Sequence, residues 1–169
     1  AGVSALGLVV YVADSDGNRI RRISAARAVT TIGGDGTAAY SDSGSGKFFG
    51  PTGVAVDAAA NAFVVDNRNY YIRKISAALV VSTIVGTGVA GGAEGPGATA
   101  QVRANARHIA VDAAGNLYVS ETARVVLIRP DESWTTATLV SGLTLGKSVA
   151  VEPTRGTVFV ADKSDQCVK

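Results

Sequence analysis

The sequence holds few side chains of the kinds that catalyse reactions, and their spacing predicts no catalytic arrangement. Its single histidine, His108, is followed four residues later by Asp112, but no serine lies in the G-x-S-x-G turn that presents a nucleophile. In GSGKF at 44–48, phenylalanine follows the lysine, where a phosphate-binding loop needs Ser or Thr. One histidine and one cysteine, far apart in the chain, do not make a zinc site. We therefore predict no catalytic, metal-binding or cofactor-binding residues.

Acidic residues recur at the same position of each repeated copy, at the end of a short apolar run. They are Asp14, Asp66, Glu121 and Asp162, at intervals of 52, 55 and 41 residues. Carboxylates repeated in this way could ring a calcium ion, which takes oxygen ligands. An acid that follows a strand can also accept N–H bonds from the next turn, which is the interpretation we favour. The same structural role is expected for Asp57, Asp112 and Glu152. A structural calcium is the one ion left open.

A group of basic and aromatic residues is the candidate interaction surface. It comes from the repeated phrases NRIRRIS at 18–24 and NYYIRKIS at 69–76 and the residues beside them. Its members are Arg19, Arg21, Arg22, Arg68, Tyr70, Tyr71, Arg73 and Lys74. Arginine beside tyrosine suits nucleic acids, but such binding needs positive charge in excess, and the net charge is only +2. We therefore expect protein or glycan contact, and no nucleic-acid partner.

The elements that carry these residues are predicted to be short strands. The 20 glycines, with many Val, Ala and Thr, favour strands and tight turns. Each copy contains a strand such as GVAV, a turn such as DAAGN, a strand ending at the acid, a basic strand, and a fourth strand such as VTTIGG. The copies span about 1–34, 50–86, 105–142 and 146–169. Four short strands per unit at this period are typical of a propeller blade.

The copies are expected to share one register in their third strands. Six positions after each acid lies an aliphatic residue, namely Ile20, Ile72, Leu127 and Val168, with Lys169 falling where Arg21 lies in the first copy. Pro130 is expected to end the third strand of the third copy early. Two long glycine-rich connectors, at 33–52 and 86–106, should project from one face.

Several of these stretches resemble the NHL-repeat family of β-propellers. They are GPTGVAVDAAANAFVVDNRNYYIRKIS at 50–76, IAVDAAGNLYVSE at 109–121 and YVADSDGNRIRRIS at 11–24. The resemblance covers nearly the whole chain. It implies an all-β fold of four-stranded antiparallel blades, with about 3.5 blades in a single partial or open propeller over 1–169. Since closed propellers need at least four blades, the chain is expected to be a fragment, a ring-closing protomer or a subunit of an open assembly.

The expected function is that of a non-enzymatic propeller module. It would contact protein or glycan, or copies of itself through the open blade ends. One alternative is a six-bladed-propeller hydrolase or lyase whose remaining blades carry the catalytic groups, and another is an RNA-binding face. The family resemblance implies an extracellular or cell-surface location. No apolar run approaches the ~20 residues of a membrane span.

Overall fold

The computed structural model describes residues 2–144, 146–152, 155–162 and 167–168, which form four antiparallel sheets. The first sheet holds β1 (Val3–Leu6), β2 (Val9–Asp14), β3 (Arg19–Ile23) and β4 (Val29–Gly33). The second holds β5 (Pro51–Val56), β6 (Ala62–Asp66), β7 (Tyr71–Ile75) and β8 (Val81–Val85). The third holds β9 (His108–Val111), β10 (Leu117–Glu121), β11 (Arg124–Ile128) and β12 (Thr136–Ser141). The fourth holds β13 (Gly146–Val151), β14 (Val158–Asp162) and β15 (Cys167–Val168).

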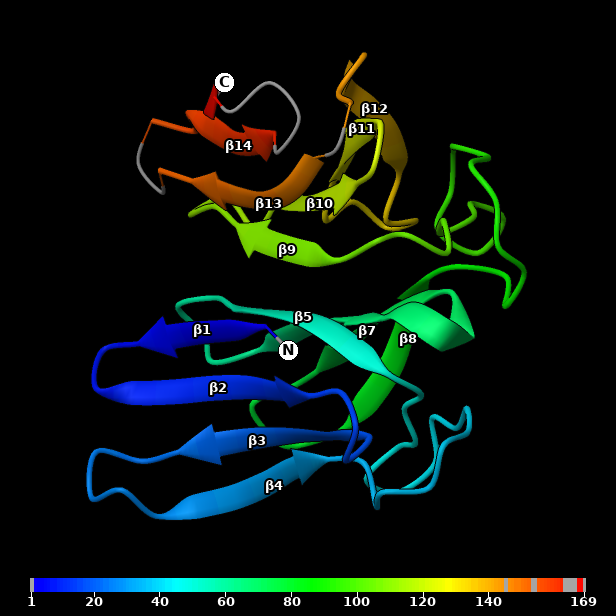
Figure 1. The fold of residues 1–169 in the computed structure, drawn as a ribbon. Coiled ribbons are helices and arrows are strands. Elements are labelled where there is room, and N and C mark those ends of the chain that lie inside the picture. The colour runs from blue at the N-terminus through cyan, green and yellow to red at the C-terminus, as the bar shows by residue number, and fades with distance from the viewer. Residues whose placement is uncertain (1, 145, 153–154, 163–166, 169) are drawn as a thin grey trace.

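The sheets are arranged around a common axis. Within each sheet the strands lie in sequence order, so every sheet is a simple meander. The first strands β1, β5, β9 and β13 lie next to one another at the centre, and the later strands extend outward (Figure 1). This architecture is a partial β-propeller, as predicted, and we call the sheets blades 1 to 4.

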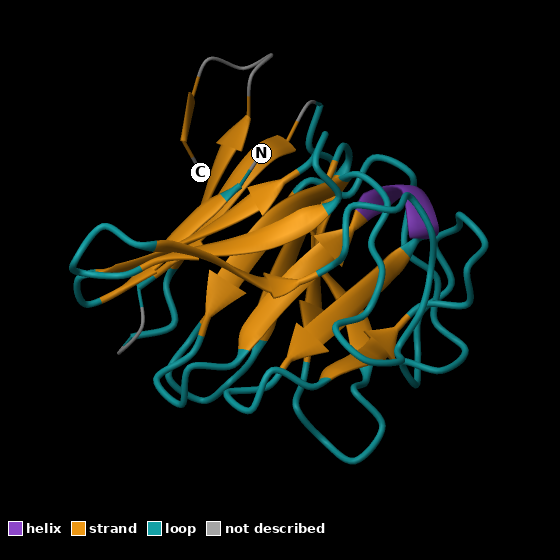
Figure 2. Ribbon diagram, turned by 90° about the horizontal axis from the view of Figure 1, so that it is seen from below, coloured by secondary structure: helices purple, strands orange, loops and turns teal. Residues whose placement is uncertain are grey.

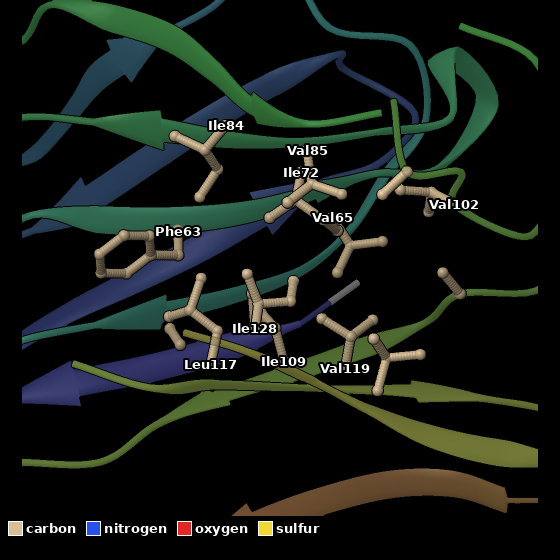
Figure 3. Close-up of a cluster of buried hydrophobic side chains, with 14 residues drawn as sticks. Phe63, Val65, Ile72, Ile84, Val85, Val102, Ile109, Leu117, Val119 and Ile128 are labelled. Carbon is tan, nitrogen blue, oxygen red and sulfur yellow. The ribbon is translucent and has the colours of Figure 1, made fainter. Parts of the chain in front are cut away.

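The hydrophobic core lies between the blades rather than inside any one of them. Between blades 2 and 3, Phe63, Val65 and Ile72 face Ile109 and Leu117 across the gap (Figure 3). Two further clusters fill the spaces between blades 1 and 2 and between blades 3 and 4. The strands β6 and β10 therefore bury both of their faces, which explains their nearly continuous apolar runs, whereas β1 in blade 1 leaves Val3 58% exposed. Burial of each such side chain stabilises the fold by roughly 1.5–3 kcal/mol.

The predicted register of the third strands is confirmed in three copies. Ile20 pairs with Ala13, Ile72 with Val65 and Val168 with Ala161, in each case the residue before the repeated acid. Lys169 lies outside the described residues.

The third copy departs from this register, and the prediction for Leu127 was wrong. Val125 pairs with the residue before Glu121 and is fully buried, whereas Leu127 lies two positions farther along and is only partly buried. The reason is the turn before β11, which has two residues (122–123) where blade 2 has four (67–70). The strand ends at Ile128, before Pro130, but it has five residues like β3 and β7, so the expected early end is not seen.

The long connections lie on one side of the molecule. We call residues 34–50 connector 1 and residues 86–107 connector 2. Both emerge on the right-hand side in Figure 1, together with the short 3-10 turn η1 (Asn67–Asn69), which Figure 2 shows among these loops. The described part of the chain holds no helix long and apolar enough to cross a membrane.

Candidate functional site

The repeated acids accept backbone hydrogen bonds, as predicted, and not all of the donors lie in the following turn. Asp14 accepts from that turn through the Gly17 N–H at 3.1 Å, and Asp66 Oδ2 accepts from Asn69 Nδ2 of its own following turn at 2.9 Å. Asp66, Glu121 and Asp162 accept backbone N–H groups of the segment that leads into their own blade. These bonds join Phe49 N to Asp66 Oδ1 (2.8 Å), Arg103 N to Glu121 Oε1 (3.1 Å) and Thr144 N to Asp162 Oδ2 (3.0 Å). The acid lies beside the start of the innermost strand, so it fixes the point where the connector enters the blade.

The second group of acids has the structural role that the sequence predicted. Asp57 Oδ1 accepts the Asn61 N–H at 2.8 Å, and Asp112 Oδ1 accepts the Asn116 N–H at 2.9 Å. Glu152 Oε2 accepts the Arg155 N–H at 2.9 Å. These carboxylates therefore close the turns between the first and second strands of their blades.

A fully buried arginine holds connector 1 against blade 2. Arg73 donates to Asp66 Oδ2 at 3.0 Å and also pairs with Asp42 of the connector. It further donates to the carbonyl oxygens of Ser41 (2.7 Å) and Lys47 (3.1 Å). Burial raises the pKa of Asp66, against the opposing effects of its hydrogen bonds and of the Arg73 charge. A buried charge of this kind requires its partners, so connector 1 is an integral part of the blade.

Connector 2 is held by the same kind of ion pair in blade 3. Arg124 donates to Glu121 Oε2 at 2.6 Å and to Glu94 Oε1 of the connector at 2.8 Å. Thr138 on the fourth strand also donates to Glu94, and these hydrogen bonds, with the charge of Arg124, lower the pKa of Glu94. Each connector is therefore fixed to its blade by an ion pair between a connector acid and an arginine.

A groove lined by aromatic residues lies beside the two connectors, between blades 2 and 3. It has a volume of about 750 Å³, and we call it the aromatic groove. Its rings come from three separate segments: Tyr40 from connector 1, Tyr71 from β7, and Trp134 from the turn between β11 and β12. Polar groups of Thr83 and Glu132 line the same groove. Wide grooves with aromatic walls and a few polar groups are typical of ligand sites.

The two tyrosines are fixed against each other. Their ring centroids are 4.6 Å apart, and the Tyr40 hydroxyl lies 3.3 Å from Thr83 Oγ1 and 3.1 Å from Asp42 Oδ2. Burial raises the pKa of Tyr71, with the nearby Tyr40 adding to the effect. The Tyr71 hydroxyl is therefore protonated at neutral pH and can donate a hydrogen bond.

The tryptophan is held in place by its turn. Trp134 has φ of 54°, a left-handed conformation that is rare for a bulky residue. Asp131 Oδ1 accepts the N–H groups of Ser133 and Thr135, both at 3.0 Å, which fixes the turn around it. The indole lies 6.0 Å from the ring of Phe63 between centroids, against blade 2.

A second hollow, of about 390 Å³, lies where blades 1, 2 and 3 meet on the connector side. Its lining includes Asn18, Arg68 and Arg107. Neither arginine makes an ion pair with any residue that the structure describes, and Arg68 lies over the Phe49 ring at 5.1 Å. The lining also holds Asp16, so both signs of charge face this hollow, and it lacks the convergent rings of the aromatic groove.

The channel along the axis is mostly apolar. It has a volume of about 300 Å³ and is lined by residues of the four innermost strands. Among the described lining residues, His108 is the only titratable one, and His108 Nδ1 lies 3.1 Å from the Val149 carbonyl oxygen. Across the described ranges, no three His, Cys, Asp or Glu side chains gather as metal ligands would.

The predicted interaction residues do not form one surface. Tyr71 lines the aromatic groove, and Lys74 Nζ lies 6.0 Å from the Trp134 ring centroid. Arg73 is fully buried beneath Tyr40, so its side chain is not available to a partner as the predicted interaction surface requires. The remaining members lie elsewhere: Arg68 in the second hollow, Tyr70 against the core between blades 2 and 3, and Arg19, Arg21 and Arg22 on blade 1.

Sequence reasoning missed Tyr40, Asp42 and Trp134. The connectors were expected to project freely, so their side chains were not considered as parts of a site. Trp134 is the only tryptophan in a chain with 6% aromatic residues, and that rarity was the one signal available.

No family model matches this sequence, and no curated protein sequence matches it. Solved structures do. A gluconolactonase from Xanthomonas campestris aligns over 99% of this chain and 55% of its own, with a TM-score of 0.70 and 16% identity. A chain in a nidogen/laminin complex aligns over 95% of this chain and 56% of its own (TM-score 0.70, 20% identity). A virginiamycin B lyase from Staphylococcus aureus aligns over 99% and 53% (TM-score 0.61, 12% identity).

These neighbours are β-propeller proteins. The likeness supports the fold and leaves the function open, since identities this low accompany many activities on one propeller scaffold. The chain spans about half the length of each of these structures.

Proposed function

We propose that the chain is a non-enzymatic NHL-type propeller module that binds an oligosaccharide in the aromatic groove, outside the cell or at its surface. The observation that carries this proposal is the convergence of Tyr40, Tyr71 and Trp134 on one groove of about 750 Å³. A sugar ring presents a face of C–H groups and an edge of hydroxyl groups. The C–H face suits the negative face of an aromatic ring, and the edge suits polar groups such as those of Thr83 and Glu132.

The turn that carries Trp134 supports a role in binding. The same turn position, also with a left-handed φ of 63°, is occupied by Arg27 in blade 1 and by Leu79 in blade 2. The turn therefore forms with quite different side chains, and its geometry does not require an indole. The indole packs with one side on Phe63 and the core between blades 2 and 3, and it also lines the open groove, where a ligand can reach it.

Catalysis is the competing function, because a gluconolactonase and a lyase are among the structural neighbours. In this chain the repeated carboxylates of Asp66, Glu121 and Asp162 accept hydrogen bonds from the chain itself. Because these carboxylates already accept backbone hydrogen bonds, their structural role favours a binding module over an enzyme.

The experiment is a titration of the full chain with neutral trisaccharides, namely chitotriose, cellotriose and maltotriose, followed by tryptophan fluorescence. Because Trp134 is the only tryptophan, its emission reports the groove alone. We expect a saturable change with at least one sugar, weakened about fivefold by Tyr71→Ala, since a lost aromatic contact costs on the order of 1 kcal/mol. Tyr71→Phe is the matched control and should bind nearly as well, because the ring remains.

Three outcomes would overturn the proposal. The first is no saturation with any of the sugars. The second is binding that Tyr71→Ala leaves unchanged. The third is turnover of a sugar lactone by the chain, which would favour the enzymatic alternative.

A further inference from the structure

Blade 1 repeats the arrangement with which blade 2 holds its connector. Arg73 pairs with Thr83 across β7 and β8, next to a register shift between Ile72 and Arg73. Arg21 pairs with Thr31 across β3 and β4, next to the same kind of register shift, between Ile20 and Arg21. Arg21 and Thr31 therefore occupy the places of Arg73 and Thr83. We call Arg21, Val29 and Thr31 the blade-1 cradle.

In blade 2, connector 1 buries Arg73 and Val81 and partly covers Thr83. Asp42 pairs with Arg73 and accepts the Thr83 N–H at 3.2 Å. Gly46 of the same connector packs on Val81, so closely that a Cβ atom at Gly46 would lie 2.8 Å from Val81 Cγ1. As a result Val81 is only 2% exposed. A loop with one carboxylate and a glycine four residues later is thus what fits this kind of surface.

In blade 1 the equivalent positions are open. Val29 pairs with Ile23 as Val81 pairs with Ile75, yet Val29 is 54% exposed. Arg21 donates to the Thr31 hydroxyl, and no carboxylate within the described ranges pairs with it. The cradle therefore presents an arginine without a counter-ion beside an exposed apolar side chain.

Blade 3 holds its connector with a related set of residues. There, too, a connector acid, Glu94, meets an arginine of the third strand and a threonine of the fourth, Arg124 and Thr138. Thr138 pairs across the sheet as Thr83 and Thr31 do, next to the same kind of register shift. Blades 2 and 3 thus each hold a glycine-rich acidic loop beside the threonine of the fourth strand, which identifies the chemistry that fits the same place in blade 1.

We propose that the blade-1 cradle binds a glycine-rich loop with one carboxylate, and that this carboxylate pairs with Arg21 and the Thr31 N–H. The loop's glycine segment covers Val29, as Gly46 covers Val81. The partner is thus a polypeptide segment with the chemistry of connector 1, supplied from outside the described strands. This site is separate from the aromatic groove and does not depend on the proposed sugar ligand.

The test uses the full chain, labelled with ¹⁵N, and a synthetic peptide with the sequence of residues 34–50 as the probe. We expect the peptide to shift the amide signals of β3 and β4, with Thr31 N–H among the largest changes. A peptide carrying Asp42→Asn should bind about tenfold or more weakly, and so should the Arg21→Met chain, because each removes one member of the ion pair. Arg22→Met is the matched control, since Arg22 is the neighbouring residue on the opposite face of the strand.

Circular dichroism of Arg21→Met separates loss of binding from loss of folding, and a folded variant that no longer binds supports the proposal. Equal binding of the Asp42→Asn peptide would overturn it. So would peptide-independent self-association that Arg21→Met abolishes, because the cradle would then take a second copy of the chain.

Discussion

Blades 2 and 3 perform the same task with arginines from different positions. In blade 2 the arginine that joins connector to strand end is Arg73, seven residues after Asp66. In blade 3 it is Arg124, three residues after Glu121, while the place of Arg73 is taken by Val126. The turn before the strand is two residues shorter in blade 3, and the arginine lies two further positions toward the start of the strand.

The comparison teaches that the geometry of the ion pair is retained while its sequence position is not. Residues two apart on a strand point to the same face, so a long guanidinium side chain can reach one carboxylate from either place. What the fold requires is a buried cation between the connector acid and the acid at the end of the second strand. Removing this cation should therefore lower the free energy of unfolding more than moving it to the other strand position does.

The largest effect is expected from Arg73→Met. The change leaves Asp66, fully buried, without its cation, and breaking a buried pair in this way costs about 3–5 kcal/mol of the free energy of unfolding. Urea denaturation followed by circular dichroism measures the loss. Lys74→Met, at the next and partly exposed position, is the control and should change the free energy by less than about 1 kcal/mol. A loss of similar size in both variants would show that the Arg73–Asp66 ion pair contributes no more to the free energy of unfolding than the partly exposed lysine does.

A smaller effect, and a sharper one, is expected from moving the arginine of blade 3. Arg124→Val alone should destabilise the fold less than Arg73→Met, because Arg103 Nε still lies 3.3 Å from Glu121 Oε2. Adding Val126→Arg restores a guanidinium at the register of Arg73, beside Thr138. We expect the double variant to recover roughly half of the lost free energy, since Val126 also packs in the core. The measurement is the same denaturation series. A double variant less stable than Arg124→Val would contradict the idea that an arginine at position 124 or 126 can pair with the connector acid.

The blades were readable from the sequence, but the docking of the connectors was not. Residues such as Ile72 and Val65 belong to strands with local patterns, and the acids Asp66 and Glu121 recur at fixed places, so both the sheets and the acceptor role were predicted. Asp42 meets Arg73 across 31 residues of chain, and no periodicity links two such residues. The same difficulty hid the aromatic groove, whose three rings come from segments that only the folded chain brings together.

The smallest effect concerns Glu94 and pH. Hydrogen bonds from Thr138, with the charge of Arg124, hold the pKa of Glu94 below its usual value of 4.5. A lowered pKa in the folded state means that the ionised carboxylate stabilises the docked connector above pH 4.5. That contribution is lost as the pH falls through the lowered pKa. The protection factor of the Gly95 amide, which corrects for the intrinsic pH dependence of hydrogen exchange, should therefore fall in acid. Glu94→Gln should show lower protection at neutral pH and little further change in acid, so an unaltered pH profile in that variant would assign the acid sensitivity to another group.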